Sequence, residues 1–139
     1  MIEVHNLTKY YQNVVAVDNI SFHVKKGEIV GFLGPNGAGK TTTMRILTCF
    51  MPATSGTAKI AGFDSFEQPL EIKKRVRYLP EIPPLYPEMT VRGYLEYVSA
   101  IKAVPSPRRK QAIDKVIEKC HLGNVGRRLI GHLSKGYRQ

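Results

Sequence analysis

The sequence predicts an α/β fold, and three observations indicate it. Alternating and β-branched patterns near the N-terminus indicate strands, and a glycine-rich loop then stands between an apolar strand and a helical pattern. In the second half, apolar residues recur at the spacing of amphipathic helices. The chain has 139 residues, 42% hydrophobic and 23% charged, which is typical of one modest globular body.

The first half of the chain holds most of the expected strands. Lys25, Lys26 and Gly27 form a tight turn before an apolar run that leads into the glycine-rich loop. Apolar residues at helical spacing follow the loop until Pro52 and Gly56 interrupt them. The expected strands cover residues 2–7, 16–24, 28–33 and 57–61, and the expected helix covers residues 41–50.

The second half is expected to be mainly helical. A brief helix at 69–76 and a short strand at 77–79 precede four prolines between 80 and 87, which exclude regular structure there. Thr90 is the predicted N-cap of a helix that ends near Pro105. Ser106 is the predicted N-cap of the next helix, with Pro107 at its first position. The apolar stripe of this helix is Ile113, Val116, Ile117 and Cys120, and Gly123 closes it.

Residues 34–41, GPNGAGKT, fit the phosphate-binding pattern G-x-x-x-x-G-K-[ST] between a strand and a helix. Glycines let the backbone approach a ligand closely, and consecutive N–H groups at a helix start form an anion site. Lys40 can reach the β- and γ-phosphates, and the Thr41 hydroxyl can ligate Mg²⁺. The motif predicts an ATP site made of Gly34, Pro35, Asn36, Gly37, Ala38, Gly39, Lys40, Thr41 and Thr42.

Net charge, cysteine content and the lack of long apolar segments limit the possible partners and location of the protein. The net charge of +10 is compatible with a nucleic-acid partner, an anionic membrane surface, or an acidic portion of the same fold outside this sequence. Cys49 and Cys120 lack metal-ligand spacing, so both are expected to be reduced, buried apolar residues. Neither a secretory signal nor a membrane-spanning stretch is visible in the sequence, which predicts a cytoplasmic protein.

Four segments in order resemble the ATP-binding subunits of ABC transporters, in particular export-type systems with a separate membrane subunit. They are LTKYYQNVVAVDNISF at 7–22, the phosphate motif at 34–41, RYLPEIPPLYPEMTV at 77–91 and LSKGYRQ at 133–139. The resemblance covers the whole chain. It implies a P-loop ATPase core with a partial, incomplete parallel sheet and an antiparallel β-subdomain over 1–82, and a helical subdomain over 83–139.

The resemblance also implies roles for residues outside the phosphate motif. Tyr11 matches the aromatic residue that stacks on adenine. Glu81 stands at the Q-loop position, where glutamine is usual, and is expected to be a Mg²⁺ ligand together with Thr41. The signature segment contacts the ATP of a second ATP-binding subunit in a head-to-tail dimer; here it contributes Ser134, Lys135 and Gly136. The implied partners are this second subunit and a transmembrane permease, with no nucleic acid, and the implied location is the cytoplasmic face of a membrane.

The family's acidic Walker B strand, catalytic glutamate and switch histidine usually follow the signature segment. A chain that stops at Gln139 is therefore expected to be a fragment that is inactive alone, although the resemblance implies an ATPase coupled to transport. No catalytic set is complete within residues 1–139. Two other functions stay open at this point, a non-catalytic nucleotide-binding or interaction module and a basic nucleic-acid binder.

Overall fold

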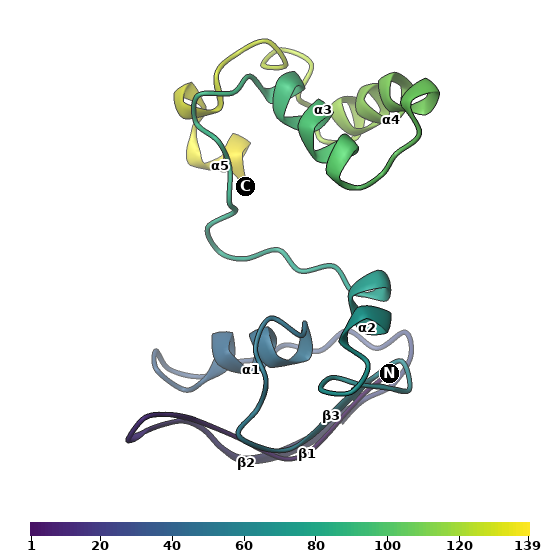
Figure 1. Ribbon diagram of the computed structural model, residues 1–139. Helices are drawn as coiled ribbons and strands as arrows, with labels where there is room; N and C mark the ends of the chain where they lie inside the picture. The colour runs from purple at the N-terminus through teal and green to yellow at the C-terminus, as the bar shows by residue number, and fades with distance from the viewer. The chain divides into compact units, whose positions relative to one another are not determined.

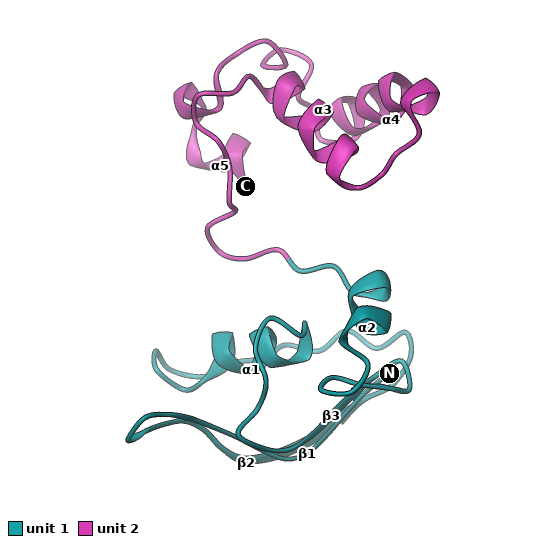
Figure 2. Cartoon of the chain, viewed as in Figure 1, with its two compact units in different colours: residues 1–78 teal, residues 79–139 magenta.

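A computed structural model describes all residues, 1–139 (Figure 1). The chain forms two compact units, residues 1–78 and residues 79–139, where its length suggested one body (Figure 2). We describe each unit by itself. None of the helices combines the length and the apolar character that crossing a lipid bilayer requires.

The first unit is built on a four-stranded antiparallel sheet. β1 (Ile2–Tyr11) and β2 (Val14–Val24) form a long hairpin, and β3 (Ser55–Ile60) pairs with the other edge of β1. The short β4 (Phe63–Asp64) pairs with β3, which gives the order β2-β1-β3-β4. The strands expected at 2–7, 16–24 and 57–61 are therefore present, and the hairpin extends further than its sequence pattern indicated.

A bulge in β1 explains why its apolar residues do not alternate regularly. Val4 and Leu7 are both buried although they are three residues apart. Between them the pairing with β2 shifts register, and Asn6 has a left-handed backbone with φ 49°. The extra residue in the bulge lets Val4 and Leu7 face the same core, although residues three apart in a regular strand face opposite sides.

The core of the first unit lies between the sheet and two helices. α1 (Lys40–Leu47) and α2 (Pro69–Arg75) lie on the same face of the sheet (Figure 1). Their inward residues join those of the strands in one cluster, which excludes water from that face. The cluster consists of Val4, Leu7, Ile46, Leu47, Ala58, Ile60 and Ile72.

Two segments predicted as strands are not strands in the structure. Residues 28–33 and 77–79 have no regular secondary structure, and the only sheet is antiparallel. Ile29 and Leu33 are 99% and 92% exposed. A strand needs a hydrogen-bonded neighbour, and no residue from 1 to 139 pairs with these apolar runs. The apolar sequence alone was therefore an insufficient signal.

The second unit is helical. It contains α3 (Val91–Ile101), α4 (Ser106–Lys119), a 3₁₀ turn η1 (Ile130–His132) and the short α5 (Lys135–Arg138). Thr90 is the N-cap of α3, as predicted, and its hydroxyl accepts a hydrogen bond from the Gly93 N–H at 3.1 Å. The core of this unit is the cluster of Val91, Val125, Ile130 and Leu133.

Two sequence expectations for α4 were wrong. Ser106 is its first helical residue and not its N-cap; Pro105 takes the cap position, and no side chain caps the helix. Cys120 is exposed, and Ile113 is the only buried residue within α4. An amphipathic pattern indicates which face turns inward, but the packing partners decide how much of that face is covered.

Candidate functional site

The sequence motif with the strongest chemical content lies in the first unit, between the end of β2 and α1. Residues 34–39, which we call the glycine loop, lead directly into α1 with Gly39 as its N-cap. Gly37 and Gly39 have left-handed backbones, with φ 85° and 81°. A Cβ atom on Gly39 would lie 2.2 Å from the Ala16 carbonyl oxygen, so only glycine fits where the loop meets β2.

The start of α1 presents unpaired backbone donors. The helical ladder begins with the Thr43 N–H, which donates to the Gly39 carbonyl at 2.8 Å. The N–H groups of Lys40, Thr41 and Thr42 precede that first bond and have no carbonyl one turn earlier. The first turn contains no acidic residue that would compete for them. These donors and the positive end of the helix suit an anion.

Lys40 adds a cation directly over the glycine loop. Its ammonium donates to the Gly34 carbonyl at 2.6 Å and to the Pro35 carbonyl at 2.7 Å. None of the three salt bridges in the protein includes Lys40, so no carboxylate neutralises its charge. The ammonium has three N–H donors, and two of them bond to these neutral carbonyls. Its positive charge therefore stays available to an anion.

The three threonines of α1 have different environments. Thr41 is exposed, Thr42 is half-buried and Thr43 is 1% exposed. The Thr43 hydroxyl donates to the Gly39 carbonyl at 3.0 Å, which ties the first turn of α1 to the glycine loop. Thr43 was not among the site residues predicted from the sequence. Hydroxyls commonly bond the carbonyl four residues earlier in a helix, so its spacing from Gly39 was an available signal.

Tyr11 stands at the end of the β1–β2 hairpin. It pairs with Val14, two residues before the Ala16 carbonyl that faces Gly39. Its side chain is 41% exposed, and its hydroxyl donates to the Met51 sulfur at 3.1 Å. The Lys9 ammonium lies 5.7 Å from the centre of its ring. The ring therefore has an open surface on the unit that carries the glycine loop.

The donors that the sequence assigned to Mg²⁺ belong to separate units. Thr41 lies in the first unit and Glu81 in the second. No group of three or more His, Cys, Asp or Glu side chains is arranged to hold a metal ion. The Thr41 hydroxyl is a hard oxygen donor of the kind that Mg²⁺ accepts, normally alongside waters and phosphate oxygens. The donor chemistry of Thr41 thus fits a metal that arrives with a phosphate ligand.

The residues of the predicted signature segment begin α5 in the second unit. Ser134 is the N-cap, and its hydroxyl accepts a hydrogen bond from the Tyr137 N–H at 3.3 Å. Lys135 and Gly136 follow in the first turn and are exposed. Glu81 and Lys135 both line a cavity of about 320 Å³ in this unit. A carboxylate and an ammonium thus lie at one cavity of the same unit.

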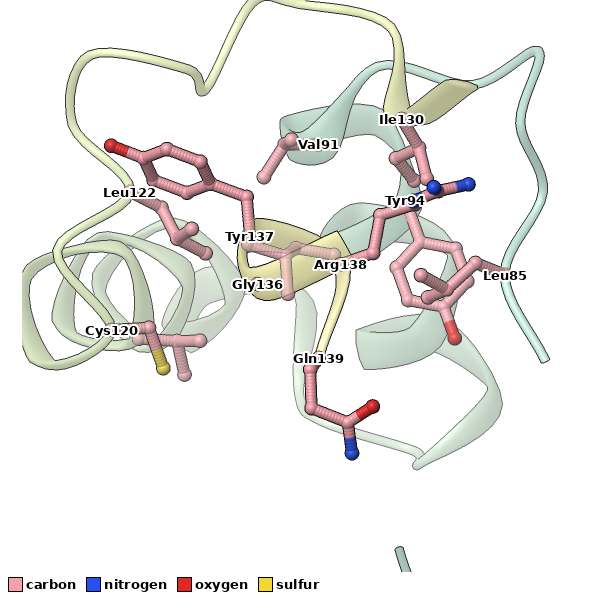
Figure 3. A pocket seen from close by; sticks show the side chains of 12 residues that line it. Leu85, Val91, Tyr94, Cys120, Leu122, Ile130, Gly136, Tyr137, Arg138 and Gln139 are labelled. Atoms are coloured by element: carbon pink, nitrogen blue, oxygen red, sulfur yellow. The ribbon is translucent and has the colours of Figure 1, made fainter. Parts of the chain in front are cut away.

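A second cavity of the second unit, of about 270 Å³, is mainly apolar. Side chains of α3 and α4 line it together with the residues of α5 (Figure 3). Val91, Tyr94 and Leu122 are among its labelled apolar residues, and Tyr137 of α5 reaches into the same space. No cluster of acids, histidines or thiols faces this cavity, which therefore offers a packing surface and no evident chemistry.

The two cysteines are free thiols in different settings. Cys49 is half-buried, and its burial raises the pKa of its thiol above the ordinary value. Cys120 is exposed, which contradicts the expectation that it is a buried apolar residue. Neither thiol belongs to the candidate site.

Comparison with known proteins places the chain in a family. The family model described as ABC transporter matches residues 17–139. The bacitracin transport ATP-binding protein of Bacillus licheniformis is 38% identical over all of this chain and 44% of its own length. The SkfA peptide export ATP-binding protein of Bacillus subtilis strain 168 is 34% identical over all of this chain and 57% of its own length. The chain thus spans about half the length of the curated relatives it matches.

Solved structures agree with this result. The structure of an ATP-binding subunit of an ABC transporter aligns with a TM-score of 0.80 and 26% identity, covering 99% of this chain and 57% of that one. An ATP-binding cassette solved as a dimer in a post-hydrolysis state, with ADP and Pi, aligns with a TM-score of 0.81 over 99% of this chain and 65% of that one. At 24% identity it supports the fold alone. From the family match over residues 17–139, the chain belongs to the ABC transporter family.

Proposed function

We propose that this protein binds ATP with Mg²⁺ through the glycine loop and the first turn of α1. One observation carries the proposal: the Lys40 ammonium is held over the loop by two neutral carbonyls, next to a helix start with unpaired N–H groups. Such an arrangement has a positive field, consecutive donors and no carboxylate, which suits a polyphosphate.

Each part of the motif has its own task in this proposal. Gly34, Pro35, Asn36, Gly37, Ala38 and Gly39 wrap the phosphates. All of them except Pro35, which has no N–H, can present a backbone donor. Lys40 exchanges the two loop carbonyls for oxygens of the β- and γ-phosphates, and Thr42 adds a phosphate contact. Thr41 contributes a hydroxyl to Mg²⁺, which neutralises part of the phosphate charge when bound.

Tyr11 is proposed to stack on the adenine ring. Its open ring surface and its place on the hairpin whose Ala16 carbonyl faces Gly39 support this role. Base–aromatic stacking contributes about 1–3 kcal/mol per base. Tyr11 would thus add affinity for the base to the affinity of the loop for phosphates.

The second unit is proposed to act on a second nucleotide. Ser134, Lys135 and Gly136 would contact ATP held by another ATP-binding subunit in a head-to-tail dimer. The cassette of the same fold described above was solved as a dimer, which is the assembly that this proposal requires. Glu81 is proposed as a further Mg²⁺ ligand, and the helical subdomain is proposed to run over residues 83–139, after a core over residues 1–82.

The physiological role is proposed to be that of an ATP-hydrolysing motor subunit of a transporter. The relatives named for bacitracin transport and for SkfA peptide export support a transport role. A transmembrane permease as partner and a location on the cytoplasmic face of the membrane are further parts of this proposal. We infer that residues 1–139 alone bind ATP without hydrolysing it. The residues at the loop supply a cation, amides and hydroxyls, and no general base.

Substitution of Lys40 tests nucleotide binding directly. We expect Lys40→Ala to weaken Mg-ATP binding by about tenfold to a hundredfold, because a hydrogen bond to a charged group contributes about 1.5–3 kcal/mol. Isothermal titration calorimetry would measure the dissociation constant, and circular dichroism would show that the variant is folded. Lys59→Ala, on the exposed side of β3, removes a lysine far from the motif in sequence and should bind normally. Equal affinity of both variants would reject the proposal.

A further inference from the structure

We propose that Lys9 and Met51 are positioning residues that hold the Tyr11 ring for a nucleotide base. On this view, the segment after α1 holds the base platform while the start of the same helix holds the phosphates. The inference rests on the proposed function, because it explains how a residue with a proposed base contact is oriented.

The Tyr11 hydroxyl is anchored to the segment that follows α1. It donates to the Met51 sulfur at 3.1 Å. Met51 is itself half-buried and packs against the core cluster of the first unit. A thioether is a weak acceptor, but it fixes the far end of the ring relative to that core. An otherwise exposed tyrosine thereby loses part of its freedom to rotate.

Lys9, on β1, places its ammonium over the Tyr11 ring. Lys9 and Tyr11 are two residues apart on β1, so their side chains leave the same face of the sheet. The Lys9 ammonium lies 5.7 Å from the ring centre and donates to the Pro52 carbonyl at 2.8 Å. The carbonyl holds the cation in place, and the cation attracts the electron-rich face of the ring. A flat ligand can then stack on the opposite face.

The segment that provides these anchors is itself fixed to β1. The Thr54 N–H donates to the Thr8 carbonyl at 2.9 Å, and the Thr54 hydroxyl accepts from the Tyr10 N–H at 3.1 Å. α1 ends just before it, with a left-handed residue at Cys49 whose N–H bonds to Ile46. One helix therefore begins directly after the glycine loop and ends at Leu47, four residues before Met51.

If Lys9 positions Tyr11, substitution of Lys9 should weaken binding of the nucleotide base and leave binding of the phosphates unchanged. We would compare the dissociation constants of Mg-ATP and of inorganic triphosphate with Mg²⁺, by calorimetry on the same preparations of the chain. The native protein should prefer ATP, and Tyr11→Ala should weaken ATP binding by about fivefold or more. Lys9→Met should weaken ATP binding by about twofold to fivefold and leave triphosphate binding unchanged. Lys9→Arg keeps a cation over the ring and should retain the preference; Lys59→Met is the matched control.

The hydroxyl anchor has its own test. Tyr11→Phe and Met51→Leu each remove the same hydrogen bond while preserving the bulk of the side chain. Each should weaken ATP binding by about twofold. The double variant should be no weaker than either single one, because the two substitutions delete one interaction. Additive losses would contradict the assignment of Met51.

The outcomes separate this inference from the proposed function. If the native protein binds neither ligand, the proposed function fails and the inference fails with it. If it binds both ligands equally well, phosphate binding stands and the base contact is overturned. If Lys9→Met keeps the full preference for ATP, or lowers the affinity for both ligands equally, Lys9 does not position Tyr11. Loss of the preference in Lys9→Met and its retention in Lys9→Arg would support the proposal.

Discussion

At the scale of single residues, Gly39 joins the candidate site to the fold. It gives α1 its N-cap, and its carbonyl accepts bonds from both the backbone and the side chain of Thr43. Its backbone also lies against the Ala16 carbonyl, where no side chain has room. The same residue thus shapes the anion site and packs the loop against β2.

Substitution of Gly39 should separate these constraints. Gly27 has nearly the same backbone, with φ 83° against 81°, but a Cβ there would meet nothing within 4 Å. Gly27→Ala should lower the free energy of unfolding by about 1 kcal/mol, the cost of a left-handed backbone. Gly39→Ala should lower it by at least about 1 kcal/mol more, because of overpacking against β2. Urea denaturation would measure both values, and equal losses would contradict the close approach at Ala16.

The sequence predicted the positions of residues that belong to a motif. It did not predict the surroundings of residues whose contacts come from distant parts of the chain. The positions of Lys40 and Thr41 at the start of a helix could be inferred from GPNGAGKT alone. The surroundings of Tyr11 could not, because Met51 is 40 residues away in sequence and reaches it through the fold. The exposure of Cys120 likewise depends on how much of α4 is covered.

At the scale of elements, local signals identified most helices and the strands of the hairpin, whereas their antiparallel arrangement was implied by the family resemblance. α3 begins after Thr90 as its cap residue predicted, and α2 begins at Pro69. The apolar run at 28–33 shows the limit, because strand formation depends on a neighbouring strand that local sequence does not specify. Ser106 shows another limit, since a preceding proline took the position that the serine was expected to fill.

The two cap residues provide a matched experiment. Thr90 accepts a hydrogen bond from the Gly93 N–H, whereas Ser106 lies inside α4 and caps nothing. Thr90→Ala should therefore lower the free energy of unfolding by about 1 kcal/mol. Ser106→Ala should change it by less than about 0.5 kcal/mol, as for surface positions without a special contact. Thermal and urea unfolding would compare the variants, and a larger loss for Ser106→Ala would show that the cap assignment is wrong.

At the scale of the whole molecule, the chain consists of an antiparallel unit that carries the glycine loop and a helical unit that carries the predicted signature segment. The sequence predicted the α/β character, and the family resemblance predicted the antiparallel and helical parts. The division after residue 78 lies next to the proline-rich segment at 80–87 and close to the boundary at 82/83 that the resemblance implied. A nucleotide site shared between two protein subunits is part of the proposed function.

The central claim is that the glycine loop and the start of α1 bind the phosphates of ATP. Its most direct test is a titration of the isotope-labelled chain with Mg-ATP, followed by the NMR signals of the backbone amides. The amides of Gly37, Gly39, Lys40 and Thr41 should shift most, because their N–H groups would gain phosphate acceptors. Saturating shifts confined to other residues, or no shifts in this loop, would contradict the account.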